Sequence, residues 1–89
     1  MPTKVAVRFF GDLGDITGKL EEEVTVEDPT LEALVSALHK SYGDKFTRFA
    51  LDPGYIFLIN GQAADVERRK NVKLADGDLV IITPALGGG

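Results

Sequence analysis

One amphipathic helix in the middle of the chain constrains the fold more than any other feature. In TLEALVSALHKSYG, which starts at Thr30, apolar residues recur at the spacing of one helical face. These residues are Leu31, Leu34, Val35, Leu38 and Tyr42. Asp28, with Pro29 at the first helical position, or Thr30 can cap the start, and Gly43 suits the end. Such a helix covers one face of one sheet, so the rest of the chain must supply that sheet.

Two strand patterns precede the helix. In Lys4–Gly11 the apolar residues Val5, Val7 and Phe9 alternate with a second set, Lys4, Ala6, Arg8 and Phe10. The glycine-rich segment GDLGDITGK follows and is expected to be a turn region, leading to a second strand around Val24–Val26.

Further strand patterns follow the helix. The segment Lys45–Pro53 is expected to be a connection pinned to the core by its apolar side chains, and Tyr55–Asn60 is the third strand. Asn60-Gly61 favours a tight turn. A short element at Val72–Leu74 and the turn ADGD precede the last strand, Leu79–Thr83.

This order of elements predicts an α+β fold of two layers, a mixed sheet with one main helix on one face. If the first and last strands lie side by side they run parallel, which is the β-grasp arrangement of ubiquitin. We expect one domain over residues 1–86 and a flexible glycine tail over residues 87–89.

Composition excludes several classes of function. The 89 residues carry a net charge of −4, which argues against a nucleic-acid-binding face. Cysteine is absent and His39 is the only histidine, so thiolate chemistry and most zinc sites are excluded. GDLGDITGKL lacks the first glycine and the hydroxyl of a phosphate loop. Without a long apolar run or a signal-peptide pattern, we expect a cytoplasmic protein that binds no metal and no membrane.

Other polar residues are expected to be solvated. His39 lies just outside the apolar stripe of the helix, and Glu21, Glu22 and Glu23 alternate between strand faces and so do not converge on a cation. The basic run from Arg68 to Lys70 is expected at a surface turn.

Phe10 shares its strand face with charged residues, so it is either covered by a loop or exposed for a partner. Both alternate sets of the last strand are apolar: Leu79 and Ile81 on one side, Val80 and Ile82 on the other. Because one helix covers one side only, an exposed apolar patch that includes Phe10 is expected, and such patches mark interaction sites.

The sequence LGGG at residues 86–89 raises a separate hypothesis. Glycines without a Cβ can lie extended in a narrow channel and bring a bare carboxylate to the reactive centre of another protein, although a disordered end is the simpler alternative.

Taken together, VAVRFFGDL, TLEALVSAL, INGQAAD and LADGDLVIITPALGGG resemble the ubiquitin-like sulfur-carrier family, over nearly the whole chain. The pattern is most similar to the small subunits of molybdopterin synthase and to small archaeal modifier proteins. The resemblance implies a non-catalytic carrier: a ubiquitin-activating-type adenylyltransferase that uses MgATP adenylates the carboxylate of Gly89, and a sulfur donor protein converts it to a thiocarboxylate. The carrier binds no cofactor of its own.

The resemblance further implies sulfur transfer to a pterin in the large subunit of molybdopterin synthase. Alternatives are a modifier joined through Gly89 to target lysines, a carrier for thiamine or tRNA thiolation, and a plain interaction module. The implied partner-binding residues are Phe10, Leu79, Ile81, Thr83, Pro84 and Leu86, and the implied tail is Gly87, Gly88 and Gly89. Thr83, Ala85 and Ala63 are smaller or more polar than is usual in the family, which weakens the assignment to one particular synthase.

Overall fold

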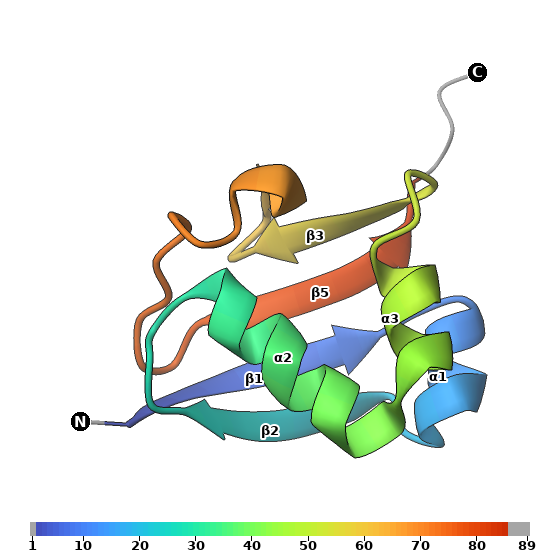
Figure 1. Ribbon diagram of the computed structural model, residues 1–89, viewed down its shortest axis with the longest axis horizontal. Helices are drawn as coiled ribbons and strands as arrows, with labels where there is room; N and C mark the ends of the chain where they lie inside the picture. The colour runs from blue at the N-terminus through green and yellow to red at the C-terminus, as the bar shows by residue number, and fades with distance from the viewer. Residues whose placement is uncertain (1, 86–89) are drawn as a thin grey trace.

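The computed structural model describes residues 2–85, which form one sheet with three helices packed against it (Figure 1). The five strands lie in the order β2-β1-β5-β3-β4. They are β1 (Thr3–Phe9), β2 (Glu21–Val26), β3 (Tyr55–Ile59), β4 (Gln62–Ala64) and β5 (Leu79–Pro84). The helices are α1 (Asp12–Thr17), α2 (Leu31–Tyr42) and α3 (Asp44–Ala50), with a 3-10 turn, η1, at Val66–Arg68.

The central pair of strands confirms the predicted β-grasp arrangement. β1 and β5 run parallel, with Ala6 opposite Leu79 and Phe9 opposite Ile82, whereas all other neighbouring strands are antiparallel. The turn before β5 fixes this register. The Asp76 carboxylate accepts from Lys4 N at 2.9 Å, and Asp78 O accepts from Ala6 N at 2.9 Å. The D-G-D motif is therefore structural.

α2 begins and ends where the sequence predicts. Thr30 is the N-cap and its hydroxyl accepts from Ala33 N at 3.1 Å, so Thr30 rather than Asp28 caps the helix. Gly43 follows the last turn with φ of 86°, a backbone conformation that glycine adopts without steric cost.

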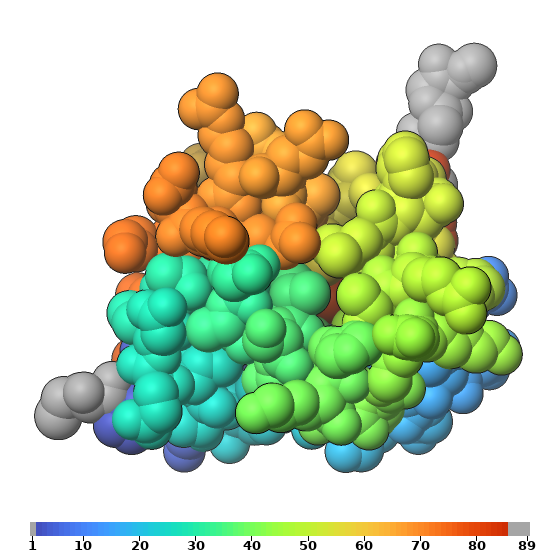
Figure 2. All heavy atoms as spheres, in the orientation of Figure 1, coloured from blue at the N-terminus to red at the C-terminus, as the bar shows by residue number. Residues whose placement is uncertain are grey.

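The core lies between the sheet and the helices. Each strand contributes alternate residues to it, and α1 and α3 close one end of the layer (Figure 1). Its largest fully buried side chains are Phe9, Phe46, Phe57, Leu13, Leu31, Leu34, Leu38 and Ile82. Figure 2 views this helix side, where side chains of α2, α3 and the segment between β4 and β5 cover the sheet.

Two predicted loops are helices instead. The expected turn region after β1 contains α1, because Leu13 is completely buried and ties this single turn and a half to the core. The expected connection at Lys45–Pro53 contains α3, in which Phe46 and Ala50 are buried one turn apart. β4 and η1 were also not predicted; β4 pairs only with β3 and is three residues long.

Candidate functional site

The side of the sheet that carries no helix has an apolar centre, here called the helix-free face. Arg8, Ile81 and Leu58 lie side by side across β1, β5 and β3, and Ile56 lies opposite Thr83 in the next row. The helix-free face comprises Phe10, Ile56, Leu58, Leu79, Ile81 and Thr83, all partly or largely exposed. As the family resemblance implies, Val80 and Ile82 face the core and are completely buried.

Phe10 is the residue that the sequence placed at the edge of this surface. Phe10 is 44% exposed, so it is exposed as the patch hypothesis predicts, and the alternative of cover by a loop is realised only in part. Its backbone N–H donates to Ile82 O at 3.0 Å, which extends the β1–β5 ladder by one residue. The structure therefore brings Phe10 beside the end of β5, with Thr83 and Pro84 following directly.

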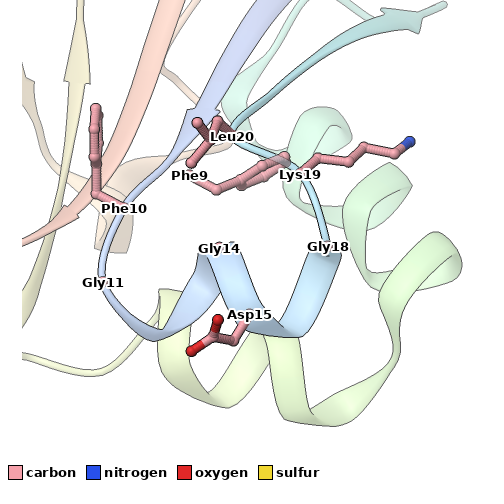
Figure 3. Close-up of a pocket in the computed structure, with 8 residues that line it drawn as sticks. All are labelled: Phe9, Phe10, Gly11, Gly14, Asp15, Gly18, Lys19 and Leu20. Carbon is pink, nitrogen blue, oxygen red and sulfur yellow. The ribbon is translucent and has the colours of Figure 1, made fainter.

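Leu20 is a second exposed apolar residue near Phe10, and the sequence pattern did not predict it. It is 77% exposed, and its carbonyl accepts from Phe9 N at 2.9 Å. Phe10 and Leu20 line a hollow of about 480 Å³ between the end of β1 and α1 (Figure 3). In this view both side chains project away from α1, which carries Asp15, and Lys19 extends outward. The only sequence signal for its exposure is that Leu20 directly follows the polar, glycine-containing segment Thr17-Gly18-Lys19.

Three backbone segments hold the end of β5, a junction called the tail root and formed by Gly11, Gly54, Tyr55, Pro84 and Ala85. Ala85 N donates to Gly54 O at 2.7 Å, and Tyr55 lies opposite Pro84 in the β3–β5 ladder. The hydroxyl of Tyr55 accepts from Asp12 N at 3.0 Å, which joins the start of α1 to β3.

Gly11 makes this junction possible. Its φ is 65° and its ψ is −142°, a conformation that L side chains rarely adopt. A Cβ on Gly11 would lie 2.6 Å from Pro84 Cγ and 2.7 Å from Tyr55 Oη. Glycine is therefore required here for close packing of the loop after β1 against Pro84.

A second hollow, of about 350 Å³, adjoins the tail root. It is lined by Asp12, Arg48, Phe49, Asp52 and Tyr55. The Asp52 carboxylate also accepts from Gly54 N at 2.7 Å, which orders the turn before β3.

The residues expected to be solvated behave in different ways. His39 is exposed, and its Nδ1 lies 2.6 Å from the hydroxyl of Thr47. Glu22 turns toward the helix side, where its carboxylate accepts from the hydroxyl of Tyr42. Burial, followed by the hydrogen bond and the charge of Glu22, raises the pKa of Tyr42 to about 12.

The basic run is only partly solvated. Arg69 Nε lies 2.7 Å from a Glu32 carboxylate oxygen on α2, and Arg69 Nη1 donates to Val66 O at 2.6 Å. Arg69 therefore bridges η1 and α2, which corrects the expectation that the whole run is solvated. Arg68 and Lys70 are exposed.

Other predicted site residues lie outside the part of the chain that the structure describes. These are Leu86, Gly87, Gly88 and Gly89. Within residues 2–85, no group of three His, Asp or Glu side chains converges as metal ligands would. No helix of this part is both long and apolar enough to cross a membrane.

Comparisons with known proteins agree on one family. A family model described as the ThiS family matches residues 7–89. The curated protein Ubiquitin-related modifier 1 of Saccharomyces cerevisiae is 34% identical, and the match covers 96% of this chain and 97% of the relative.

Several solved structures share the fold. Small archaeal modifier protein 1 of Haloferax volcanii is 25% identical, with a TM-score of 0.75 over 97% of this chain and 99% of that chain. A putative molybdopterin converting factor subunit 1 from Pyrococcus furiosus is also 25% identical, with a TM-score of 0.75 over 92% and 97%. A third structure is the complex of subunits 1 and 2 of the molybdopterin-converting factor from Helicobacter pylori. Its matched chain is 25% identical to this chain, with a TM-score of 0.60 over 98% of this chain and 100% of that chain.

Proposed function

The chain belongs to the ThiS family of ubiquitin-like sulfur carriers and modifiers, and from this premise we propose that it carries sulfur as a thiocarboxylate on Gly89. The observation that carries the proposal is the way in which β5 ends. Ala85 is held at the tail root by Gly54, and the sequence continues from this fixed point with Leu86 and three glycines. A fixed root followed by residues without side chains suits delivery of a carboxylate to another protein.

The chemistry needs activation of the carboxylate, because oxide is a poor leaving group. In the proposed reaction a carboxylate oxygen of Gly89 attacks the α-phosphate of ATP, and pyrophosphate leaves. Hydrosulfide delivered by a donor protein then attacks the acyl carbon of the adenylate. The C–S bond forms, AMP leaves, and loss of the S–H proton gives the thiocarboxylate. A ubiquitin-activating-type adenylyltransferase supplies the ATP site and its magnesium. This chain supplies the carboxylate and the surfaces that position it, in keeping with the generally non-catalytic character of small carriers of this kind.

For the acceptor of the sulfur we propose a pterin precursor in molybdopterin biosynthesis. Support comes from the likeness to the Pyrococcus furiosus protein, described as subunit 1 of molybdopterin converting factor, and from the Helicobacter pylori complex of subunits 1 and 2. The corresponding partner of this chain would be the large subunit of a molybdopterin synthase.

A second candidate function is a protein modifier joined through Gly89 to lysines of target proteins. The relative with 34% identity is itself named a ubiquitin-related modifier, and the structural relatives include small archaeal modifier protein 1. Both functions use the same activated carboxylate. Sulfide attacks its acyl carbon in sulfur transfer, whereas a lysine amine attacks it in conjugation to a target protein.

The partner surface in either case is proposed to be the helix-free face together with the tail root. Phe10 and Ile81 supply exposed apolar area there, and Thr83 and Pro84 lead into the tail. Ile56 and Leu58 enlarge this surface beyond the residues expected from the sequence, because β3 lies directly beside β5. We propose that Leu86, which lies outside the described residues, also contacts the partner.

Deletion of Gly89 tests the proposal. The fold of residues 2–85 should be unchanged, but the carboxylate would lie about 3.3–3.6 Å short of the reactive centre. Misplacement by about 1 Å can already cost around a hundredfold in rate. We expect no thiocarboxylate with an adenylyltransferase partner, MgATP and a sulfur source, measured by the mass of the intact protein.

Two matched variants accompany the deletion. One alanine added after Gly89 should be equally inactive, whereas Gly87→Ser should remain active. Incubation of the parental thiocarboxylate with the large synthase subunit and pterin precursor, or with an extract containing target proteins, separates the two acceptors. Parental rates for the Gly89 deletion would show that its carboxylate is not the working group.

A further inference from the structure

β2 forms a free edge of the sheet. Phe9 N donates to Leu20 O at 2.9 Å, and Val7 lies opposite Glu22. Because backbone groups alternate in direction along an antiparallel strand, those of Glu21, Glu23 and Thr25 point away from β1. Within residues 2–85 these outward N–H and C=O groups have no hydrogen-bond partner. β2 therefore offers an open template for one further strand.

A hollow lies beside this edge. It has a volume of about 430 Å³ and lies between the end of β2 and α2. Buried Val26 and, from α2, Ala33 and Ala37 line its apolar part. The other residues that line it are Thr25, Glu27, Asp28, Ser36 and Lys40. In Figure 2 the residues of β2 and the start of α2, coloured teal, form the lower left edge of the molecule. The small side chains of α2 leave room there for an apolar side chain from a strand laid along β2.

We propose that the β2 edge binds an extended segment of a partner protein in which basic and apolar residues alternate. Successive side chains of an added strand point to opposite faces of the sheet. Those on the helix side would lie over the hollow, which favours apolar residues. Those on the other side would lie beside the exposed carboxylates of Glu21 and Glu23, which favours Lys or Arg.

The acidic edge also decides against self-pairing. Two copies joined through β2 in antiparallel register about Glu23 would place Glu23 directly opposite its own copy. Like charges at opposed positions destabilise a strand pair. Lys4 and Arg8 of β1 each contact one oxygen of these carboxylates, at 3.9 Å to Glu23 and 2.8 Å to Glu21, which leaves the second oxygen for a partner cation. The other sheet edge, β4, is only three residues long.

The hollow is separate from the tail root, although the β2 edge extends to Glu21, which lies opposite Arg8 of the helix-free face. The hollow adjoins Val26, which lies opposite Thr3 at the start of β1, whereas Phe10 and the tail root follow the end of β1. A segment bound at the hollow leaves the tail root open. A partner could therefore hold this chain while another protein handles the tail.

The test uses the isotopically labelled protein and a synthetic peptide in which lysine and valine alternate. A peptide of the same composition, with its lysines in one block and its valines in another, is the control. We expect the alternating peptide to shift the amide resonances of Glu21, Glu23 and Thr25 and the methyl resonances of Ala33 and Ala37. Shifts confined to the helix-free face, equal shifts with both peptides, or no shifts would overturn the proposal.

Matched variants test the backbone and the charge separately. Thr25→Pro removes an outward N–H, which an edge strand tolerates, and should weaken binding about tenfold, whereas Thr25→Val should stay near parental affinity. Glu23→Lys should weaken binding about fivefold. Glu67→Lys makes the same charge change on η1 and should have little effect.

If Glu23→Lys and Glu67→Lys lower the affinity for the peptide equally, binding depends only on the net charge of the protein, and the proposal is overturned. A dimer of the free protein that blocks the β2 resonances would do the same. If Thr25→Pro does not fold, the peptide-induced shifts of the parental resonances decide whether the peptide binds along β2. These measurements involve no thiocarboxylate, so their failure is distinct from failure of the proposed function.

Discussion

Replacement of Gly11 by alanine should both destabilise the protein and disturb the tail root. Gly11 lies between β1 and α1 with φ of 65°, and its Cα faces Pro84 and Tyr55. The new methyl group would meet Pro84 Cγ at 2.6 Å and Tyr55 Oη at 2.7 Å. Neither neighbour can move freely, because Pro84 is in the β5 ladder and the Tyr55 hydroxyl accepts from Asp12 N.

Two costs add at this position. A non-glycine residue in a sparsely populated backbone region costs about 1–3 kcal/mol. An extra methyl group forced into a well-packed contact costs about 1–3 kcal/mol more. We therefore expect Gly11→Ala to lower the free energy of unfolding by about 2–6 kcal/mol, a large part of the stability of a domain of this size.

Gly14→Ala is the matched control. Gly14 lies in α1, and its new Cβ would come no closer than 3.8 Å to Phe9 O, an ordinary contact. Alanine is favoured over glycine in a helix by about 1 kcal/mol, so this variant should be as stable as the parent or more so. Urea unfolding followed by circular dichroism measures both variants against the parent. If Gly11→Ala unfolds within about 0.5 kcal/mol of the parent, the close packing at the tail root is refuted.

Two further predictions concern Phe10 and Tyr42. Phe10→Asp should weaken binding to the proposed activating enzyme, measured by calorimetry. It should lower the free energy of unfolding by about 1 kcal/mol, because a residue that is 44% exposed has only about half of its area buried. A larger loss of stability would show that Phe10 is part of the core. The pKa of Tyr42 is raised to about 12 from 10.0 in the folded protein. The neutral hydroxyl therefore stabilises the folded state fully below pH 10, and this stabilisation is lost as the pH rises toward 12. Unfolding measured across this range should show the loss in the parent and not in Tyr42→Phe; an identical pH dependence in the two proteins would contradict the assignment.

The sequence predicted the elements in which periodicity is long or the turn residues are specific. α2 has three turns of apolar repeat between Thr30 and Gly43, and both of its ends are as predicted. The Asn60-Gly61 turn also lies where expected, with φ of 51° and 88°. α1 could not be predicted, because a six-residue helix that contains a glycine owes its order to one buried side chain, Leu13. α3 carried a usable signal: Phe46, Phe49 and Ala50 follow helical spacing.

The candidate site was predictable in its apolar residues and not in its junctions. Alternation along β1 predicted that Phe10 leaves the core, and on β5, where both alternate sets are apolar, the family resemblance implied the same of Ile81; both side chains do so. Gly11 and Tyr55 were missed because their role depends on contact with Pro84, which is more than seventy residues from Gly11 in the chain. The contact of Arg69 with Glu32 of α2 likewise joins residues that are far apart in the chain. Such long-range pairs leave no local pattern in the sequence.

The tail root also limits where a partner can act. Ala85 is the last residue that the structure describes, and four residues follow it in the sequence. At no more than about 3.6 Å for each residue, Gly89 can lie at most about 14 Å from Ala85. Any reactive centre that meets the Gly89 carboxylate must therefore come within this distance of the tail root, and the protein that carries it must pack against surface close by. Phe10, Ile56 and Ile81 supply apolar surface close to that point on the helix-free face, whereas the hollow beside β2 lies at the other end of β1. Under the proposed function, the activating enzyme and the sulfur acceptor would therefore use the same surface, so they would bind in turn.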